Sequence, residues 1–437
     1  MNDIERKIKD FAKEQGVEVV GVAGPDRLNG PPFLDPTYIM KGARSIVSMA
    51  LPMNVQAIYD FIGKKSPVPH SLDQLAGNQR MFSTSEKLAL YLISQGYRAR
   101  AVQSNNMYRR NLDAFATLPN FSHRFGAIAS GIAAQGWSGN VMTEEYGAAM
   151  FLGTVVTDAV LKSDTPRYSP RHFIDNNCVK CRKCEQTCVA GMFEPKREEY
   201  VLLNGELHPR GKRRDINLCN ASCFGLHSLS RDKKWTTWGY RWIDKWIENP
   251  PDVTRKGEIR LDLLKAGAKS GDSTARYDFI RASASQILPE SMINEYVSQF
   301  KENASQAERN KLIVEFSHKL GIKGLKDDHI LTCGNCATIC GPTVEECARR
   351  YDVLTESGIM VKAPNGEMVN AGTYEKAVEM RKKYMPHVTK SEMINDAWAS
   401  TVLFHKRYFG IEPKSIAQGI IYSRKLKKAV KALGEVN

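Results

Sequence analysis

Eight of the ten cysteines form a pattern that is typical of iron–sulfur proteins. The pattern consists of two blocks and one isolated cysteine, namely Cys178-x-x-Cys181-x-x-Cys184-x-x-x-Cys188, Cys219, and Cys333-x-x-Cys336-x-x-x-Cys340. Three closely spaced thiolates can bind three corners of a cubane, and the fourth cysteine of such a block reaches the other cluster. This interleaved spacing predicts two [4Fe–4S] clusters in one chain.

The spacing also suggests which thiols share a cluster. Because the second block supplies only three ligands, the eighth must come from elsewhere, and Cys219 is favoured over its rival Cys223. Cys347 is interpreted as a small buried side chain. Zinc also binds paired cysteines, but a tight run of four cysteines without a histidine fits zinc poorly. The expected ligand sets are Cys178, Cys181, Cys184 and Cys340 for one cluster, and Cys188, Cys219, Cys333 and Cys336 for the other.

Length and composition place the chain among ordinary globular proteins. It has 437 residues, with 42% hydrophobic and 25% charged residues, and this length predicts two or three domains. The charged start MNDIERKIKDFAKEQG has neither an apolar signal core nor a twin arginine. No apolar run approaches the roughly 20 residues that span a bilayer. Together with reduced cysteines, these features predict a cytoplasmic protein.

The chain is basic, with 62 Lys and Arg against 48 Asp and Glu and a net charge of +14. Each oxidised cluster with its four thiolates contributes roughly −2, so the loaded protein would carry about +10. A basic surface can steer acidic electron donors, anionic substrates or anionic membranes. The basic residues are spread along the chain without a recognition motif for nucleic acid, so no nucleic-acid partner is predicted.

The first 165 residues alternate between helical and extended patterns. Periodicity predicts helices over 3–15, 85–97 and 123–136, and strands over 17–24, 43–53, 97–104 and 150–161. This alternation indicates a mixed α/β domain.

Four tryptophans at 235, 238, 242 and 246 have the spacing of one apolar helix face, and the alternative is the roof of a hydrophobic pocket.

The cysteines divide the remainder of the chain. Because the two cysteine blocks must meet in space, the long stretch between them is interpreted as an insertion. The fold class is therefore α+β. The expected domains are an α/β core (1–165), a split ferredoxin module (166–223 and 326–350), a mostly helical insertion (224–325) and a C-terminal extension (351–437).

Three segments of the core and the order of the cysteines resemble a known family. The segments are SHRFGAIASGIAAQGWSGNVMTEEYGAAMFLGTVVTDAVL (122–161), ARSIVSMALP (43–52) and SEKLALYLISQGYRA (85–99). Together with the cysteine blocks and Cys219, they are similar to reductive dehalogenases and epoxyqueuosine reductases. The resemblance covers roughly 1–225 and 330–345.

The resemblance implies a nitroreductase-like core that binds cobalamin or another corrinoid in its base-off form, next to a bacterial two-cluster ferredoxin module. Electrons from a ferredoxin or flavodoxin would pass through the two clusters to cobalt, and Co(I) would cleave a bond in a small-molecule substrate reductively. The expected function is a corrinoid-dependent iron–sulfur reductase that cleaves a carbon–halogen or carbon–heteroatom bond. The alternative is a two-cluster electron-transfer protein that reduces a corrinoid protein or another partner without substrate chemistry of its own.

The chain also departs from the family pattern. Cys188 is followed by Val189, and Cys340 by Gly341, where the family usually has proline. Dehalogenases often carry a cation soon after the Tyr-Gly pair, whereas Tyr146-Gly147 is followed by two alanines. The acidic proton donor of epoxyqueuosine reductases has no convincing counterpart. These departures indicate a substrate outside both groups.

Candidate proton donors and cofactor contacts follow from the residue types. Tyr108 precedes two arginines that would favour its ionised form, although it also fits an exposed loop. His123 can hydrogen-bond a cofactor amide or be a satisfied buried histidine, and Tyr146 lies in the family segment.

Five glycines allow close approach of a large flat ligand or form turns, namely Gly131, Gly136, Gly139, Gly147 and Gly153. The basic end of the segment 397–433 suggests a peripheral membrane contact, with an ordinary packing helix as the alternative.

Overall fold

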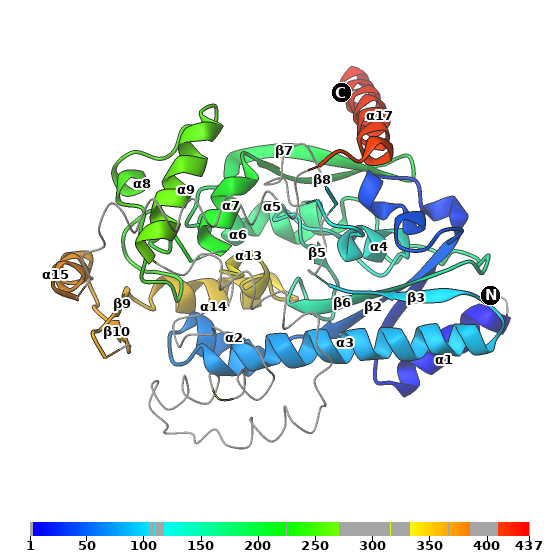
Figure 1. The fold of residues 1–437 in the computed structure, drawn as a ribbon, viewed down its shortest axis with the longest axis horizontal. Helices are drawn as coiled ribbons and strands as arrows, with labels where there is room; N and C mark the ends of the chain where they lie inside the picture. The colour runs from blue at the N-terminus through cyan, green and yellow to red at the C-terminus, as the bar shows by residue number, and fades with distance from the viewer. Residues whose placement is uncertain are drawn as a thin grey trace.

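The computed structural model describes residues 3–104, 109–110, 118–223, 225–270, 315, 333–365, 367–384 and 410–436. Within these ranges the fold is a mixture of helices and antiparallel strands (Figure 1). No helix in the described part is both long and apolar enough to cross a membrane.

A four-stranded sheet in the order β1-β2-β6-β3 forms the centre of the N-terminal half. Its strands are β1 (Val19–Ala23), β2 (Ser45–Pro52), β3 (Ala99–Val102) and β6 (Met150–Thr157). All neighbouring strands are antiparallel, with Val47 opposite Val22 on one side and Val155 on the other. The four predicted strands are therefore confirmed.

Helices cover both faces of this sheet, because successive residues of β2 point to opposite sides. Val47 and Met49 pack in the cluster that contains α1 (Asp3–Glu14) and α3 (Val68–Ser94). Ile46 and Ala50 pack in the cluster that contains α4 (His123–Ala129). Figure 1 shows α1 and α3 below the strands and α4 above them. Short 3₁₀ turns at Pro25–Arg27, Pro32–Leu34 and Pro36–Tyr38 connect β1 to β2.

Two of the predicted helices have other bounds in the structure. Helix α3 begins at Val68, well before the predicted 85–97 segment. Helix α4 ends at Ala129, whereas a helix over 123–136 was predicted. Gly131 has a φ of +75°, which ends the helix, and the chain continues into the short hairpin of β4 (Ala134–Gln135) and β5 (Val141–Met142). The small residues after Ala129 therefore form a turn and a strand.

The cysteine blocks lie on short helices beside the sheet. The first block occupies a π-helical turn (Ile174–Cys178), α5 (Val179–Cys181) and α6 (Lys183–Gln186). A hairpin of β7 (Phe193–Leu203) and β8 (Glu206–Arg213) follows, and then α7 (Ile216–Cys223). The second block lies at α13 (Asn335–Thr338), which precedes α14 (Val344–Thr355). Helix α13 packs against α6, and α14 packs against α5, α6 and α2 (Val55–Ile62).

The tryptophan-rich segment is not a single helix, so that prediction is wrong. All four tryptophans are buried, but only Trp246 lies in a helix, α8 (Asp244–Glu248). The chain before α8 is held by specific bonds, such as the one from Trp238 Nε1 to the Phe61 carbonyl at 2.6 Å. Helix α9 (Lys256–Ser270) follows. Most of the proposed insertion, including 271–314 and 316–325, lies outside the described residues.

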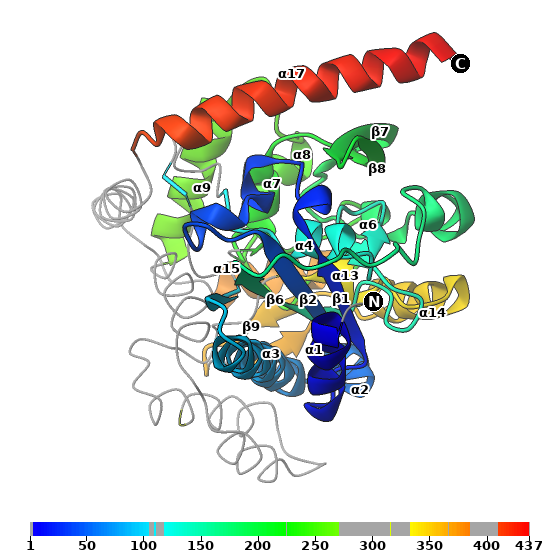
Figure 2. The same ribbon diagram turned by 90° about the vertical axis from the view of Figure 1, so that its right-hand side faces the viewer.

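The last described elements are β9 (Met360–Lys362), β10 (Met368–Asn370), α15 (Tyr374–Tyr384) and α17 (Pro413–Val436). The expected boundary between residues 350 and 351 falls inside α14. Figure 2 shows α17 as a long helix at the edge of the molecule, beside β7. Tyr422 on α17 accepts a hydrogen bond from the Leu202 amide, which holds the helix to the hairpin.

Candidate iron–sulfur and cofactor site

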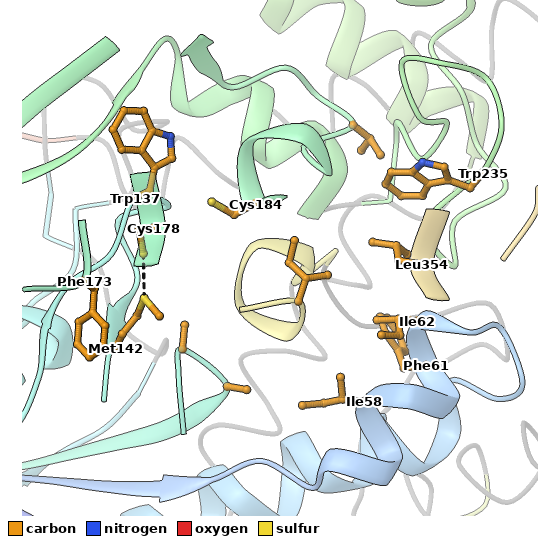
Figure 3. Close-up of a cluster of buried hydrophobic side chains, with 14 of the residues drawn as sticks. Ile58, Phe61, Ile62, Trp137, Met142, Phe173, Cys178, Cys184, Trp235 and Leu354 are labelled. Atoms are coloured by element: carbon orange, nitrogen blue, oxygen red, sulfur yellow. Dashed lines mark hydrogen bonds between the residues drawn. The ribbon is translucent and has the colours of Figure 1, made fainter. Parts of the chain in front are cut away.

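The structure brings the cysteines into two groups. In the first group, the Cys178 and Cys340 sulfurs lie 3.3 and 3.6 Å from the Met142 sulfur, although Met142 and Cys340 are 198 positions apart. Figure 3 shows Cys178 pointing at Met142, with Cys184 in the same buried cluster. The thiols that line this pocket belong to Cys178, Cys181, Cys184, Cys340 and Cys347.

The second group lies beside α7. Cys219 and Cys223, one turn apart on that helix, have sulfurs 3.7 Å apart. Their electrostatic neighbours are the other thiols expected for this cluster, Cys188, Cys333 and Cys336. Both candidates for the eighth ligand therefore stand in the same group, and the choice of Cys219 over Cys223 stays a prediction.

The thiols differ in their ease of ionisation. The neighbouring Cys181 thiol, and next the Cys340 thiol, lower the pKa of Cys347 to about 3. The Cys223 thiol acts in the same way on Cys219, whose pKa falls to about 7. Burial raises the pKa of Cys188 to about 12. Such interacting thiols titrate as sets, and a metal centre that binds them would take the thiolate forms.

The donor chemistry fits iron–sulfur clusters. Each group gathers five soft thiol ligands from segments far apart in the chain, which is the ligand type that such clusters use. Among the described residues, no three His, Cys, Asp or Glu side chains are arranged to hold a single metal ion. The first group encloses only about 20 Å³ of free space, so a cubane would fit only after the thiol side chains rotate outward.

A cavity of about 1520 Å³ lies between the sheet and the second thiol group. Its wall contains β3, part of β6, and the start of α4. Gly139, Asn140 and Val141 line it from the β4–β5 hairpin, and Ala337 lines it from the second cysteine block. Because drug-sized ligands occupy pockets of about 300–1,000 Å³, this cavity can accept a larger molecule.

The cavity wall carries several arginines next to the second thiol group. Arg124 donates to the Gly139 carbonyl at 3.3 Å, and Arg213 donates to the Ser138 carbonyl at 2.5 Å. Burial, and next the neighbouring Arg210 and Arg124, lower the pKa of Arg213 to about 10, while the Cys336 and Cys219 thiols act in the opposite direction. Positive charge is thus concentrated where thiolates and a cluster would be negative.

One short segment connects the cavity with both thiol groups. The Asn140 side-chain amide donates to the Cys336 sulfur at 3.4 Å. Val141 faces the cavity. The Met142 sulfur contacts Cys178 and Cys340. Three successive residues therefore link the cavity, the second group and the first group.

His123 lines the cavity at the start of α4. Its Nδ1 lies 2.8 Å from Thr154 Oγ1, and its Nε2 lies 3.3 Å from Ser104 Oγ. Burial lowers the His123 pKa to about 4. The ring is therefore neutral near pH 7 and is oriented by two hydroxyl groups.

The two candidate tyrosines have different outcomes. Tyr108 lies outside the described residues. Tyr146 packs against the cluster around α4 and does not belong to the described cavity wall. Burial, and next the charge of Glu145, raise the pKa of Tyr146. The structure thus brings only His123 of the three candidates to the cavity within the described residues.

The candidate glycines serve close packing at several places, and only Gly139 lines the cavity. A Cβ on Gly139 (φ +76°) would lie 1.9 Å from the Arg213 guanidinium. A Cβ on Gly147 (φ +62°) would lie 2.4 Å from the Cys340 carbonyl oxygen. The other three, Gly131, Gly136 and Gly153, would meet Pro166, Met142 and Met81.

Several residues of the site were not predicted from the sequence. Asn140, Met142 and Arg213 have no motif of their own, and their contacts exist only after the hairpin has packed on the cysteine segments. Cys347 is buried, as expected, but its thiol neighbours were not foreseen. The one available signal was the position of Asn140 and Met142 inside the segment 122–161, which carries the family resemblance.

Comparisons with known proteins give a sequence relative and several structural neighbours. An epoxyqueuosine reductase from Atelocyanobacterium thalassa (isolate ALOHA) is 25% identical over 201 residues, which is 43% of this chain and 63% of the relative. The match thus spans less than two thirds of that relative's length. No family model matches the chain.

Two structural neighbours are a selenomethionine-labelled epoxyqueuosine reductase and a catabolic reductive dehalogenase. The first has a TM-score of 0.34 at 14% identity, with 80% of this chain and 99% of that chain covered. The second has a TM-score of 0.37 at 16% identity, and the match covers 63% of this chain and 35% of the dehalogenase chain. The sequence match agrees with the resemblance seen in the core segments and the cysteine order, and over the matched 201 residues the chain is similar to an epoxyqueuosine reductase.

Proposed function

We propose that this protein is a corrinoid-dependent iron–sulfur reductase that cleaves a carbon–halogen or carbon–heteroatom bond in a small molecule. One observation carries the proposal most directly. The wall of the large cavity includes Asn140, and the Asn140 amide contacts the Cys336 thiol at 3.4 Å. A cofactor in the cavity would therefore be separated from a cluster ligand by a single side chain.

The cavity suits a corrinoid in three respects. Its volume of about 1520 Å³ accommodates a macrocycle with its side chains. Apolar residues such as Leu152 and Phe125 can pack on the ring face, while Asn78 and Gln74 offer hydrogen-bond groups to peripheral amides. In the base-off form no lower axial base has to fit beneath the ring. A bound corrinoid supplies a strongly reducing, nucleophilic metal centre.

The contacts suggest a direction for electron flow. The second thiol group adjoins the cavity through Asn140 and Arg213, so it would hold the cluster proximal to the corrinoid. The first group lies beside Lys180, Arg182 and Lys183, of which Lys180 is exposed. A basic surface of this kind favours an acidic low-potential donor such as ferredoxin or flavodoxin. Arg124 and Arg213 would offset the negative charge that accumulates near the proximal cluster.

The protein side chains would divide the remaining work. A neutral His123, held by Thr154 and Ser104, can orient a polar group in the cavity. Because its pKa is about 4, it holds no spare proton near neutral pH. Tyr108 is the proposed proton donor, with Arg109 and Arg110 next to it in the sequence. We assign Tyr146 a packing role.

The wider organisation is part of the same proposal. A nitroreductase-like core (1–165) would hold the corrinoid, and the split ferredoxin module (166–223 and 326–350) would hold both clusters in a cytoplasmic protein. We propose a small-molecule substrate and no nucleic acid, because the chain lacks a recognition motif for the latter. One similar solved structure is an epoxyqueuosine reductase in complex with a tRNA stem loop, so tRNA is the natural control ligand.

Anaerobic reconstitution with iron, sulfide and a corrinoid tests the proposal. We expect about eight iron atoms per chain, together with the EPR signal of a base-off corrinoid during stepwise reduction. Iron without retained corrinoid would favour the alternative, a two-cluster electron-transfer protein. Near-zero iron with stoichiometric zinc would refute both readings.

A further inference from the structure

Cys347 is a fifth thiol in a pocket where a cluster needs four. Its thiol neighbours the thiols of both Cys181 and Cys340, and it donates to the Gly341 carbonyl at 3.6 Å. These two residues belong to different cysteine blocks. Cys347 is buried, with 6% of its surface exposed, and it lines the same pocket as the four expected ligands. The position is therefore within the ligand shell, although it lies outside the spacing pattern.

The helix that carries Cys347 is firmly anchored. Thr343 caps α14 by accepting a hydrogen bond from the Glu346 amide at 3.1 Å. The Glu346 carboxylate binds Arg350 at 2.7 Å and Tyr59 at 3.0 Å. Arg350 is 2% exposed and donates to the Thr338 carbonyl at 2.9 Å, which ties α14 to the second cysteine block. Cys347 lies between these two anchoring residues, so its position facing the pocket is fixed by the fold.

The thiols of Cys181, Cys347 and Cys340 are neighbours in that order, with Cys347 in the middle. Cys340 contacts both Cys178 and Cys347, and Cys181 contacts Cys347. The thiol neighbours of Cys184 in the described part of the chain are Cys178, Cys181 and Cys336. Cys347 is thus adjacent to two of the four expected ligand positions and not to the position of Cys184.

We propose that Cys347 is a reserve ligand of the first cluster, able to bind the iron corner of Cys340 or Cys181 when either thiol is lost. The proposal rests on the cluster-binding part of the proposed function. A thiolate already in contact with the ligand that it replaces needs only a side-chain rotation and a small shift of the cluster. Iron–sulfur clusters accept any correctly placed thiolate, so the exchange conserves charge and ligand type.

Iron and acid-labile sulfide content after anaerobic reconstitution tests this directly, without an activity assay. The wild type and Cys347→Ala should each hold about eight iron atoms per chain. Cys340→Ala and Cys181→Ala should also hold about eight, because Cys347 replaces the missing thiol. The double variant Cys340→Ala/Cys347→Ala should hold about four. The matched control Cys184→Ala should also hold about four, since the thiols that neighbour Cys184 are those of Cys178, Cys181 and Cys336.

The outcomes separate the two proposals. The reserve role would be overturned by about four iron atoms in both Cys340→Ala and Cys181→Ala. It would also be overturned by about four iron atoms in the single variant Cys347→Ala, because Cys347 would then be an ordinary ligand. Near-zero iron in the wild type would instead refute cluster binding itself. The iron of the second cluster serves as a folding control. A folded variant retains the roughly four iron atoms of that cluster, whereas a misfolded variant would lose them as well. If one single variant fails to fold, the other tests the same prediction at a different corner of the cluster.

Discussion

The side-chain amide of Asn140 donates a hydrogen bond to the Cys336 sulfur at 3.4 Å, from the wall of the large cavity. The contact joins the N-terminal core to the second cysteine block, 196 positions later in the chain. Hydrogen bonds to ligand sulfurs are among the factors that set cluster potentials. In the proposed function, Asn140 would therefore influence both cofactor binding and electron transfer.

Replacement of Asn140 by alanine should lower the midpoint potential of one cluster, because the reduced, more negative cluster loses a hydrogen-bond donor. We expect a shift of about 60 mV, equal to a tenfold change in a one-electron equilibrium. An EPR-monitored redox titration measures it. Asn78→Ala is the control, because Asn78 also lines the cavity but donates to the Gln74 carbonyl. Equal potentials for Asn140→Ala and the wild type would contradict the assignment.

Replacement of Leu152 by tryptophan should block the cavity without disturbing the clusters. Leu152 lies on β6 and lines the cavity, so a larger side chain would occupy space needed by the corrinoid. Overpacking costs of about 1–3 kcal/mol correspond to a roughly 5- to 150-fold loss of corrinoid affinity. Binding is followed by absorbance titration, and iron content should stay at the wild-type value.

Val160→Trp is the matched control for the cavity, because Val160 follows the same strand and is 56% exposed. It should leave corrinoid binding unchanged. Unaltered binding in Leu152→Trp would show that the corrinoid does not use this cavity.

Reversal of charge at Lys180 should slow reduction by an acidic protein donor. Lys180 is exposed next to the first thiol group, and the association of charged partners depends on such local fields. For Lys180→Glu we expect a fall in the second-order rate constant by up to about tenfold at low salt, shrinking as ionic strength rises. Stopped-flow reduction by ferredoxin measures it. Lys41→Glu, also at an exposed position, should have a smaller effect, and equal effects would argue against docking at the first group.

His123 should contribute to the pH dependence of stability. Its folded-state pKa is lowered to about 4 by burial, whereas in the unfolded chain a histidine titrates near 6.5. Between these values the unfolded chain binds one more proton, so stability rises with pH and is lost as pH falls below about 6.5. The loss is about 1.4 kcal/mol per pH unit.

Urea unfolding of the iron-free protein at pH 7.5 and pH 5.5 measures this contribution. His123→Gln should lose about 1 kcal/mol less than the wild type between these two conditions. An equal loss in both proteins would mean that His123 is protonated in the folded state or exposed to water.

The core strands could be predicted from the sequence because their pattern is local. The run Ile46–Leu51 is apolar on both faces apart from Ser48, and the structure buries its apolar residues under helices on the two sides. The β7–β8 hairpin was missed, although Asn204-Gly205 carries the signal for a tight hairpin turn, with φ of +53° and +85°. The tryptophan segment was misassigned because its spacing of three and four residues matches a helix that the observed backbone does not adopt.

The site was predictable only where covalent spacing carries the information. The cysteine blocks predict iron–sulfur chemistry from the sequence because ligand spacing is a property of the local chain. The neighbours of those cysteines depend on contacts between distant segments, such as Met142 with Cys340. No periodicity in the sequence specifies that Cys347 meets Cys181, since this contact requires α14 to dock through Glu346 and Arg350.

The backbone bond from the Ala148 amide to the Cys340 carbonyl, at 2.9 Å, ties the N-terminal core to the second cysteine block. Met142 and Cys340 are separated by 198 positions. A ribosome that adds about 5–20 residues per second needs roughly 10–40 s to synthesise that interval. For the later part of this time, the 152 positions from Cys188 to Cys340, the first cysteine block exists without all its partners, so neither predicted ligand set is complete. On the proposed ligand assignment, metal loading would follow synthesis of the second block, and until then the thiols of the first block would depend on the reducing capacity of their surroundings.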